Sequence, residues 1–174
     1  SLGELLYPDF INYVKVFMRE GDKMLTEKFI EEYKNSLPPE QAENCINFSY
    51  AYIAHVKGEL TQALVLIQKV NFPLMIMKVQ VKIMQIQLNY ELGYLEETRE
   101  LTEYFRKSLQ KEEGISQDYK NSILSFLKLT VSLINLQLIN DKQKRDIANS
   151  KFHEDLKLNQ KNHFGIRFWL EDRI

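Results

Sequence analysis

Several residue types are scarce in this sequence, and each shortage excludes a class of protein. The 174 residues include a single cysteine, Cys45, so neither a framework of internal disulfides nor a zinc site made of several cysteines can form. The 23 basic and 24 acidic residues give a net charge of −1, which excludes a general electrostatic attraction to nucleic acid or to an anionic membrane. Glycine (six) and proline (four) are few, and no proline follows Pro73, which leaves room for long helices.

The sequence also has no apolar run of membrane-spanning length. Its most apolar segment, 123–139, contains a lysine, an asparagine and a glutamine, and it is shorter than the ~20 mostly apolar residues that cross a bilayer. We therefore expect no membrane span. No basic region precedes an apolar stretch at the N-terminus, where Glu4 and Asp9 interrupt the sequence, so no secretory signal is expected and a cytoplasmic location is favoured.

The residues between the glycines and prolines predict an all-α protein. Apolar residues recur at spacings of three and four, as they do on one face of a helix. The segment 78–83 alternates polar and apolar residues in the manner of a strand, but in a wider window Met77, Val81 and Met84 share one helical face. The expected helices are 8–20, 24–35, 39–57, 60–70, 74–92, 94–110, 117–139, 142–157 and 163–173.

An internal repeat relates two of the expected helix pairs. The segment 58–63, Gly-Glu-Leu-Thr-Gln-Ala, aligns with 93–98, Gly-Tyr-Leu-Glu-Glu-Thr, at an offset of 35 residues. Glycine permits the left-handed turn that reverses the chain, and the small residue five positions later lets the second helix approach the first. A period near 34 that comprises a helix, a glycine turn and a second helix resembles the tetratricopeptide repeat.

This resemblance implies a short right-handed solenoid of antiparallel helix hairpins over residues 1–140. Residues 141–174 would then form a polar helix and a short aromatic helix that caps the array. Ile86 and Met75 depart from the residues usual in the family, so a generic antiparallel helical bundle is the alternative fold. The aromatic helix would cover helix 117–139 or else dock on another molecule. Its apolar residues are Phe164, Phe168, Trp169, Leu170 and Ile174.

No pattern in the sequence predicts catalysis, a cofactor or a metal site. Glycine-rich phosphate loops, dinucleotide-binding glycine motifs and the zinc-protease and serine-hydrolase signatures are all missing. Cys45 and His55 are almost three turns apart on one expected helix and cannot act as nucleophile and base. His153, Glu154 and Asp155 are consecutive, so their side chains point apart on a helix. We expect no enzymatic activity, no cofactor and no bound metal.

Nucleic acid is not an expected partner either. The densest basic run, 142–145, is followed by Lys151 and Lys157, but acidic residues are interspersed among these basic ones. The solvated face of a helix explains this pattern without a nucleic-acid ligand.

The tetratricopeptide resemblance implies a role in binding other proteins. In that family the first helix of each hairpin lines a concave groove, and the corresponding positions here combine aromatic and polar side chains suited to an extended peptide or a helix. We therefore expect a non-catalytic scaffold for a protein or peptide segment, with Tyr52 and Tyr90 partly exposed. The expected partner-binding residues are Phe48, Tyr52, His55, Ile83, Gln87 and Tyr90.

Three alternatives stay open at the level of sequence. The same side chains would be ordinary core residues if a neighbouring helix covered them. The chain would be a regulatory or ligand-sensing domain if it belonged to a larger protein. A helical bundle would serve only in oligomerisation, and association with a second copy is compatible with either fold.

Overall fold

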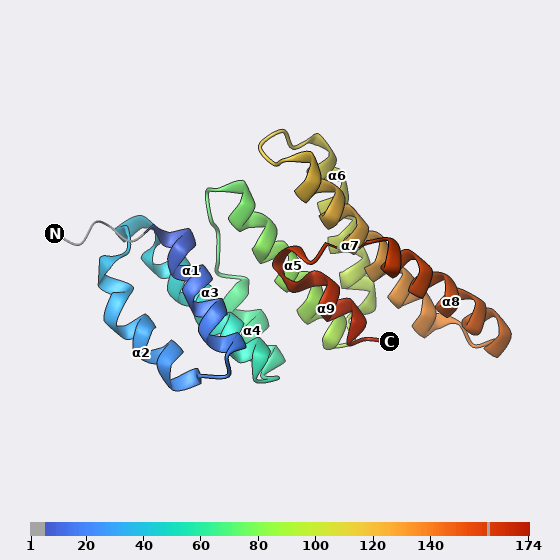
Figure 1. Ribbon diagram of the computed structural model, residues 1–174, viewed down its shortest axis with the longest axis horizontal. Helices are drawn as coiled ribbons and strands as arrows, with labels where there is room; N and C mark the ends of the chain where they lie inside the picture. The colour runs from blue at the N-terminus through green and yellow to red at the C-terminus, as the bar shows by residue number, and fades with distance from the viewer. Residues whose placement is uncertain (1–5, 160) are drawn as a thin grey trace. The chain divides into compact units, whose positions relative to one another are not determined.

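The computed structural model describes residues 6–159 and 161–174, and among these residues it contains helices and no strand (Figure 1). The all-α prediction is confirmed, including the helix across the alternating segment 78–83. No helix in this part of the chain is long and apolar enough to cross a membrane. The helices are α1 (Tyr7–Arg19), α2 (Lys23–Tyr33), η1 (Lys34–Ser36), α3 (Pro39–Val56), α4 (Leu60–Ile67), α5 (Met75–Glu91), α6 (Leu95–Lys111), α7 (Gln117–Leu138), α8 (Lys142–Leu158), η2 (His163–Gly165) and α9 (Ile166–Glu171).

The helix boundaries follow from local signals in the sequence. Gly21 and Gly58 adopt φ angles of +78° and +77°, in the left-handed region that glycine enters without steric cost. At Gly58 the turn is a Schellman motif, because the Gly58 N–H donates to the His55 carbonyl and the Glu59 N–H donates to the Ala54 carbonyl. Gly93, at φ +80°, marks the matching position after α5. The glycines thus end the helices where the repeat predicts a turn.

Other helices begin at polar N-caps. The carboxylate of Asp22 accepts from the Leu25 N–H at the start of α2, and the carboxylate of Asp141 accepts from the Lys144 N–H at the start of α8. Most of the expected helix boundaries lie within two residues of those observed, and two expected helices differ by more. The helix expected over 60–70 ends at Ile67, and the one expected over 163–173 is divided into η2 and α9. In the second case Phe164 adopts φ +56°, which is incompatible with a continuous helix.

The chain divides into two compact units, residues 1–92 (unit 1) and residues 93–174 (unit 2). In unit 1, α1 packs on α2 and α3, α3 packs on α4, and α4 packs on α5. Ala51 and Ala63 are fully buried, so α3 and α4 can approach closely, as the repeat predicts. Phe10, Phe48 and Phe72 are the largest side chains enclosed in this core.

In unit 2 the central element is α7, which packs on α6, α8 and α9. Its buried face carries Ile123, Phe126 and Leu133. The ring of Trp169 on α9 meets the ring of Phe126 edge to face, with 5.8 Å between the ring centroids. The short aromatic helix at the end of the chain therefore lies on α7.

Candidate functional site

The first part of the candidate site is a stripe of α3 that holds three of the expected partner-binding residues. Phe48, Tyr52 and His55 lie at helical positions i, i+4 and i+7 and so share one face. The structure corrects the expectation for Phe48, which is fully buried and lies 5.9 Å from Phe72 between ring centroids. Phe48 serves the core of unit 1, because an aromatic ring at the middle of α3 fills the space between α3 and its neighbours. Tyr52 and His55 remain partly exposed.

A lysine from α1 contacts this stripe. The Lys15 amine lies 5.8 Å from the centroid of the Tyr52 ring and 5.6 Å from that of Phe48, within the range of a cation–π interaction. The same amine donates a hydrogen bond to the side-chain oxygen of Gln80 on α5. Burial of the amine, and secondarily the positive charge of Arg19 one turn away, lower the pKa of Lys15 to about 8. Lys15 thereby joins three helices of unit 1.

A second polar contact joins the last turns of α3 and α5. The His55 Nε2 lies 3.1 Å from each carboxylate oxygen of Glu91. The two side chains are only 14% and 13% exposed. Because an ionised carboxylate only accepts hydrogen bonds, this geometry places a hydrogen on the Nε2 of His55. The contact holds the imidazole in one orientation beside Tyr52.

Among the titratable side chains of α3, burial affects Tyr52 and Cys45. Burial raises the pKa of the Tyr52 hydroxyl, and the positive charge of Arg19 partly opposes this effect. The Tyr52 hydroxyl is therefore a neutral group that can both donate and accept a hydrogen bond. Burial raises the pKa of the Cys45 thiol to about 12. Cys45 is thus a buried thiol and not an activated nucleophile.

The expected residues of α5 are placed differently from those of α3. Ile83, Gln87 and Tyr90 are all buried, and Tyr90 is only 7% exposed, contrary to the expectation that its ring is accessible. On α5, Gln80 accepts a hydrogen bond from Lys15 of α1, and the carboxylate of Glu91 lies beside His55 of α3. Gln80 and Glu91 share a stripe of α5 with Gln87, at spacings of seven and four. Ile83 and Tyr90 lie on another side of α5, away from the core cluster of unit 1.

The repeat pattern does not indicate Lys15, Gln80 or Glu91 as site residues. The repeat offset aligns His55 with Tyr90, whereas the residue that contacts His55 is the adjacent Glu91. A polar stripe on a mostly apolar helix, Gln80, Gln87 and Glu91, was the one available signal. We refer to Lys15, Tyr52, His55, Gln80 and Glu91 as the three-helix cluster, since they come from α1, α3 and α5.

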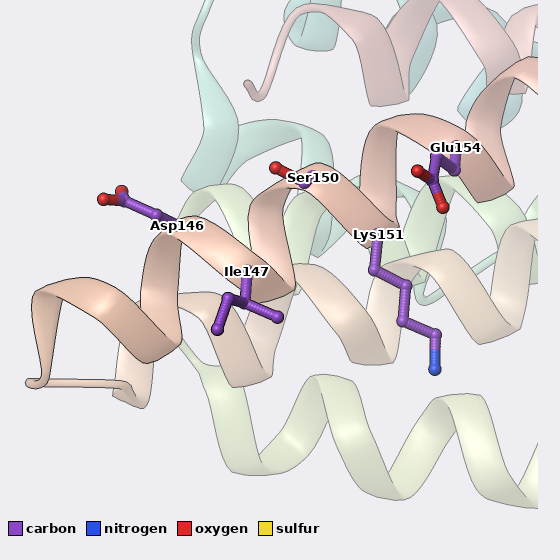
Figure 2. A pocket seen from close by; sticks show the side chains of 5 residues that line it. All are labelled: Asp146, Ile147, Ser150, Lys151 and Glu154. Carbon is purple, nitrogen blue, oxygen red and sulfur yellow. The ribbon is translucent and has the colours of Figure 1, made fainter.

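A hollow on α8 is lined by Asp146, Ile147, Ser150, Lys151 and Glu154 (Figure 2). All five residues belong to this one helix, and Figure 2 shows their side chains directed to different sides of it. Of the neighbouring acidic residues, Asp155 forms an ion pair with Lys128 of α7, 3.3 Å from nitrogen to oxygen. Within residues 6–159 and 161–174 no group of three or more histidine, cysteine or acidic residues could hold a metal ion. The hollow is a solvated helix surface and does not bring reactive groups together.

Comparison with known proteins adds no assignment to this geometry. No protein-family model, no curated protein and no solved structure matches the chain. We base the proposed function on the three-helix cluster, because it brings together polar and aromatic side chains from three helices of unit 1.

Proposed function

We propose that this chain is a non-catalytic protein-interaction module, built of tetratricopeptide-like helix hairpins, that binds a peptide or protein segment across α1, α3 and α5. The observation that supports the proposal most is the three-helix cluster itself. The first helices of the hairpins α1–α2 and α3–α4, together with α5, contribute its side chains through two sets of contacts, Lys15 with Tyr52 and Gln80, and His55 with Glu91. In a solenoid of this kind the first helices form the ligand-facing side.

The cluster offers a ligand two kinds of contact. The partly exposed ring of Tyr52 supplies apolar contact area with little loss of side-chain entropy, and its hydroxyl can orient a peptide group. Lys15 and the exposed Arg19 supply positive charge near one end of the surface, and Glu91 supplies negative charge near the other. A segment that crosses α1, α3 and α5 would therefore meet an aromatic centre between polar ends, which resembles the composition of protein interfaces.

The proposal is tested by capture of partners with the full chain as bait. An extract of the source organism is passed over wild-type protein, over Tyr52→Ala and over Tyr104→Ala. Tyr104 is the matched control, because it is a tyrosine of α6 that is 68% exposed and lies outside the cluster. We expect a partner that binds the wild type and Tyr104→Ala and is lost with Tyr52→Ala, while circular dichroism shows equal helix content in all three. Equal capture by all three proteins would contradict the proposal.

A further inference from the structure

The hairpin of α1 and α2 exposes an apolar face that is separate from the three-helix cluster. The ring of Phe29 lies 5.6 Å from that of Tyr13 and 5.4 Å from that of Phe17, so the aromatic side chains of the two helices form one surface. Tyr13 is 50% exposed and Met24 is 83% exposed. We call this surface the hairpin face. It consists of Tyr13, Val16, Phe17, Met24, Leu25 and Phe29.

The position of this face in unit 1 explains why it is exposed. In Figure 1, α2 lies at the outer edge of unit 1, and its main contacts there are with α1 and η1. The hairpin buries its other side through α1, which packs on α3. In stacked helix hairpins each unit normally covers the next, and an end that stays in water is usually polar. An aromatic end of this kind is characteristic of a contact surface rather than of a solvated cap.

The charges beside the hairpin face indicate what covers it. Lys28 and Glu32 lie three and seven residues after Leu25, on the same side of α2 as Leu25 and Phe29. Both are exposed, and among the residues that the structure describes the ion pairs of α2 involve other side chains. The two charges are opposite and one helical turn apart. If two α2 helices lie antiparallel, Lys28 of each copy therefore faces Glu32 of the other.

We propose that the hairpin face binds the same face of a second copy of this chain, in a two-fold symmetric dimer with the two α2 helices antiparallel. A two-fold axis requires a surface that complements itself. The hairpin face meets this requirement. Its aromatic residues can pack against the same residues of the second copy, and its flanking charges form two equivalent Lys28–Glu32 pairs across the axis. The dimer uses none of the five residues of the three-helix cluster, so it is independent of the proposed peptide binding.

The dimer is tested by sedimentation velocity on the full chain with four proteins: wild type, Lys28→Glu, Glu32→Lys and the double exchange Lys28→Glu with Glu32→Lys. We expect the wild type to dimerise. Each single reversal places like charges opposite one another twice and should weaken dimerisation by about tenfold or more. The double exchange restores opposite charges and should recover most of the affinity. Lys142→Glu, an exposed reversal on α8, is the control and should leave the dimer intact.

A further variant, Leu25→Asp, tests the apolar part of the face. Leu25 is 43% exposed, so this change should leave the helix content and the urea unfolding midpoint nearly unchanged while it abolishes the dimer. Three results would each overturn the proposal. They are a wild type that stays monomeric at its highest soluble concentration, a dimer that none of these changes weakens, and a double exchange no better than the single reversals.

Discussion

The imidazole of His55 is held by the carboxylate of Glu91, with its Nε2 3.1 Å from both carboxylate oxygens and both side chains largely withdrawn from water. The two residues are 36 positions apart in sequence and lie in the last turns of α3 and α5. A contact of this kind has a larger effect on stability than an exposed ion pair, because water screens it less.

We expect a double-mutant cycle on His55→Ala and Glu91→Ala to give a coupling free energy of about 1–2 kcal/mol in urea unfolding at neutral pH. The pair Lys23–Glu27 on α2, with side chains nearly half exposed, is the control and should give at most about 0.5 kcal/mol. Equal coupling in the two cycles would mean that the His55–Glu91 contact is not formed in solution.

Gly58 should tolerate no residue with a β-carbon without loss of stability. Its φ angle is +77°, and a β-carbon added there would meet no atom within 4 Å, so the cost is purely conformational. We expect Gly58→Ala to lower the free energy of unfolding by about 1–2 kcal/mol. Gly58→Asn should lose clearly less, because asparagine enters the left-handed region more readily. Unfolding curves that show no difference between wild type and Gly58→Ala would contradict the turn geometry.

Ala63 is fully buried where α4 crosses α3, so a large side chain there should strain the hairpin. We expect Ala63→Phe to lower the free energy of unfolding by about 1–3 kcal/mol. Val65→Phe, two residues further on at a position that is 51% exposed, is the matched control and should stay within about 0.5 kcal/mol of wild type. Thermal melts in which both variants behave alike would show that α4 does not pack on α3 as described.

Lys15 should make the stability depend on pH in the alkaline range. Its pKa is lowered from 10.5 to about 8, so between these values the unfolded chain keeps a proton that the folded protein has released. Stability must therefore rise with pH across this window. Lys15→Met removes the cost of burying the charge, so the stability of the variant relative to wild type should decrease as the pH is raised from 7.5 to 10. A difference in urea midpoint that stays constant with pH would contradict the enclosed amine.

The helices and turns could be predicted because the signals for them are local. Gly58, Gly93 and the N-cap Asp141 each determine a boundary through interactions within a few residues. The α3 stripe was also predictable in part, because Tyr52 and His55 are three residues apart and so share one face of the helix. Phe48 could not be separated from them, because helical spacing does not show which end of a stripe a neighbouring helix covers.

The rest of the candidate site depends on how distant helices pack. Lys15 meets Gln80 across 65 residues of sequence, and His55 meets Glu91 across 36. The polar stripe of α5 marks Gln80 and Glu91 as unusual on that helix, but local spacing does not indicate which residues of α1 and α3 they contact. Tyr90 and Glu91 are adjacent, so a small rotation of α5 about its axis decides which of them faces α3. The packing of α5 on α4 fixes this rotation.

The central claim, that a partner binds across α1, α3 and α5, is tested most directly by the affinity of the captured partner in isothermal titration calorimetry. Wild type and Tyr104→Ala should bind with the same dissociation constant. Tyr52→Ala should bind about 30-fold more weakly, as expected for an aromatic residue central to an interface. Equal affinity of Tyr52→Ala and wild type, with unchanged helix content, would contradict the claim.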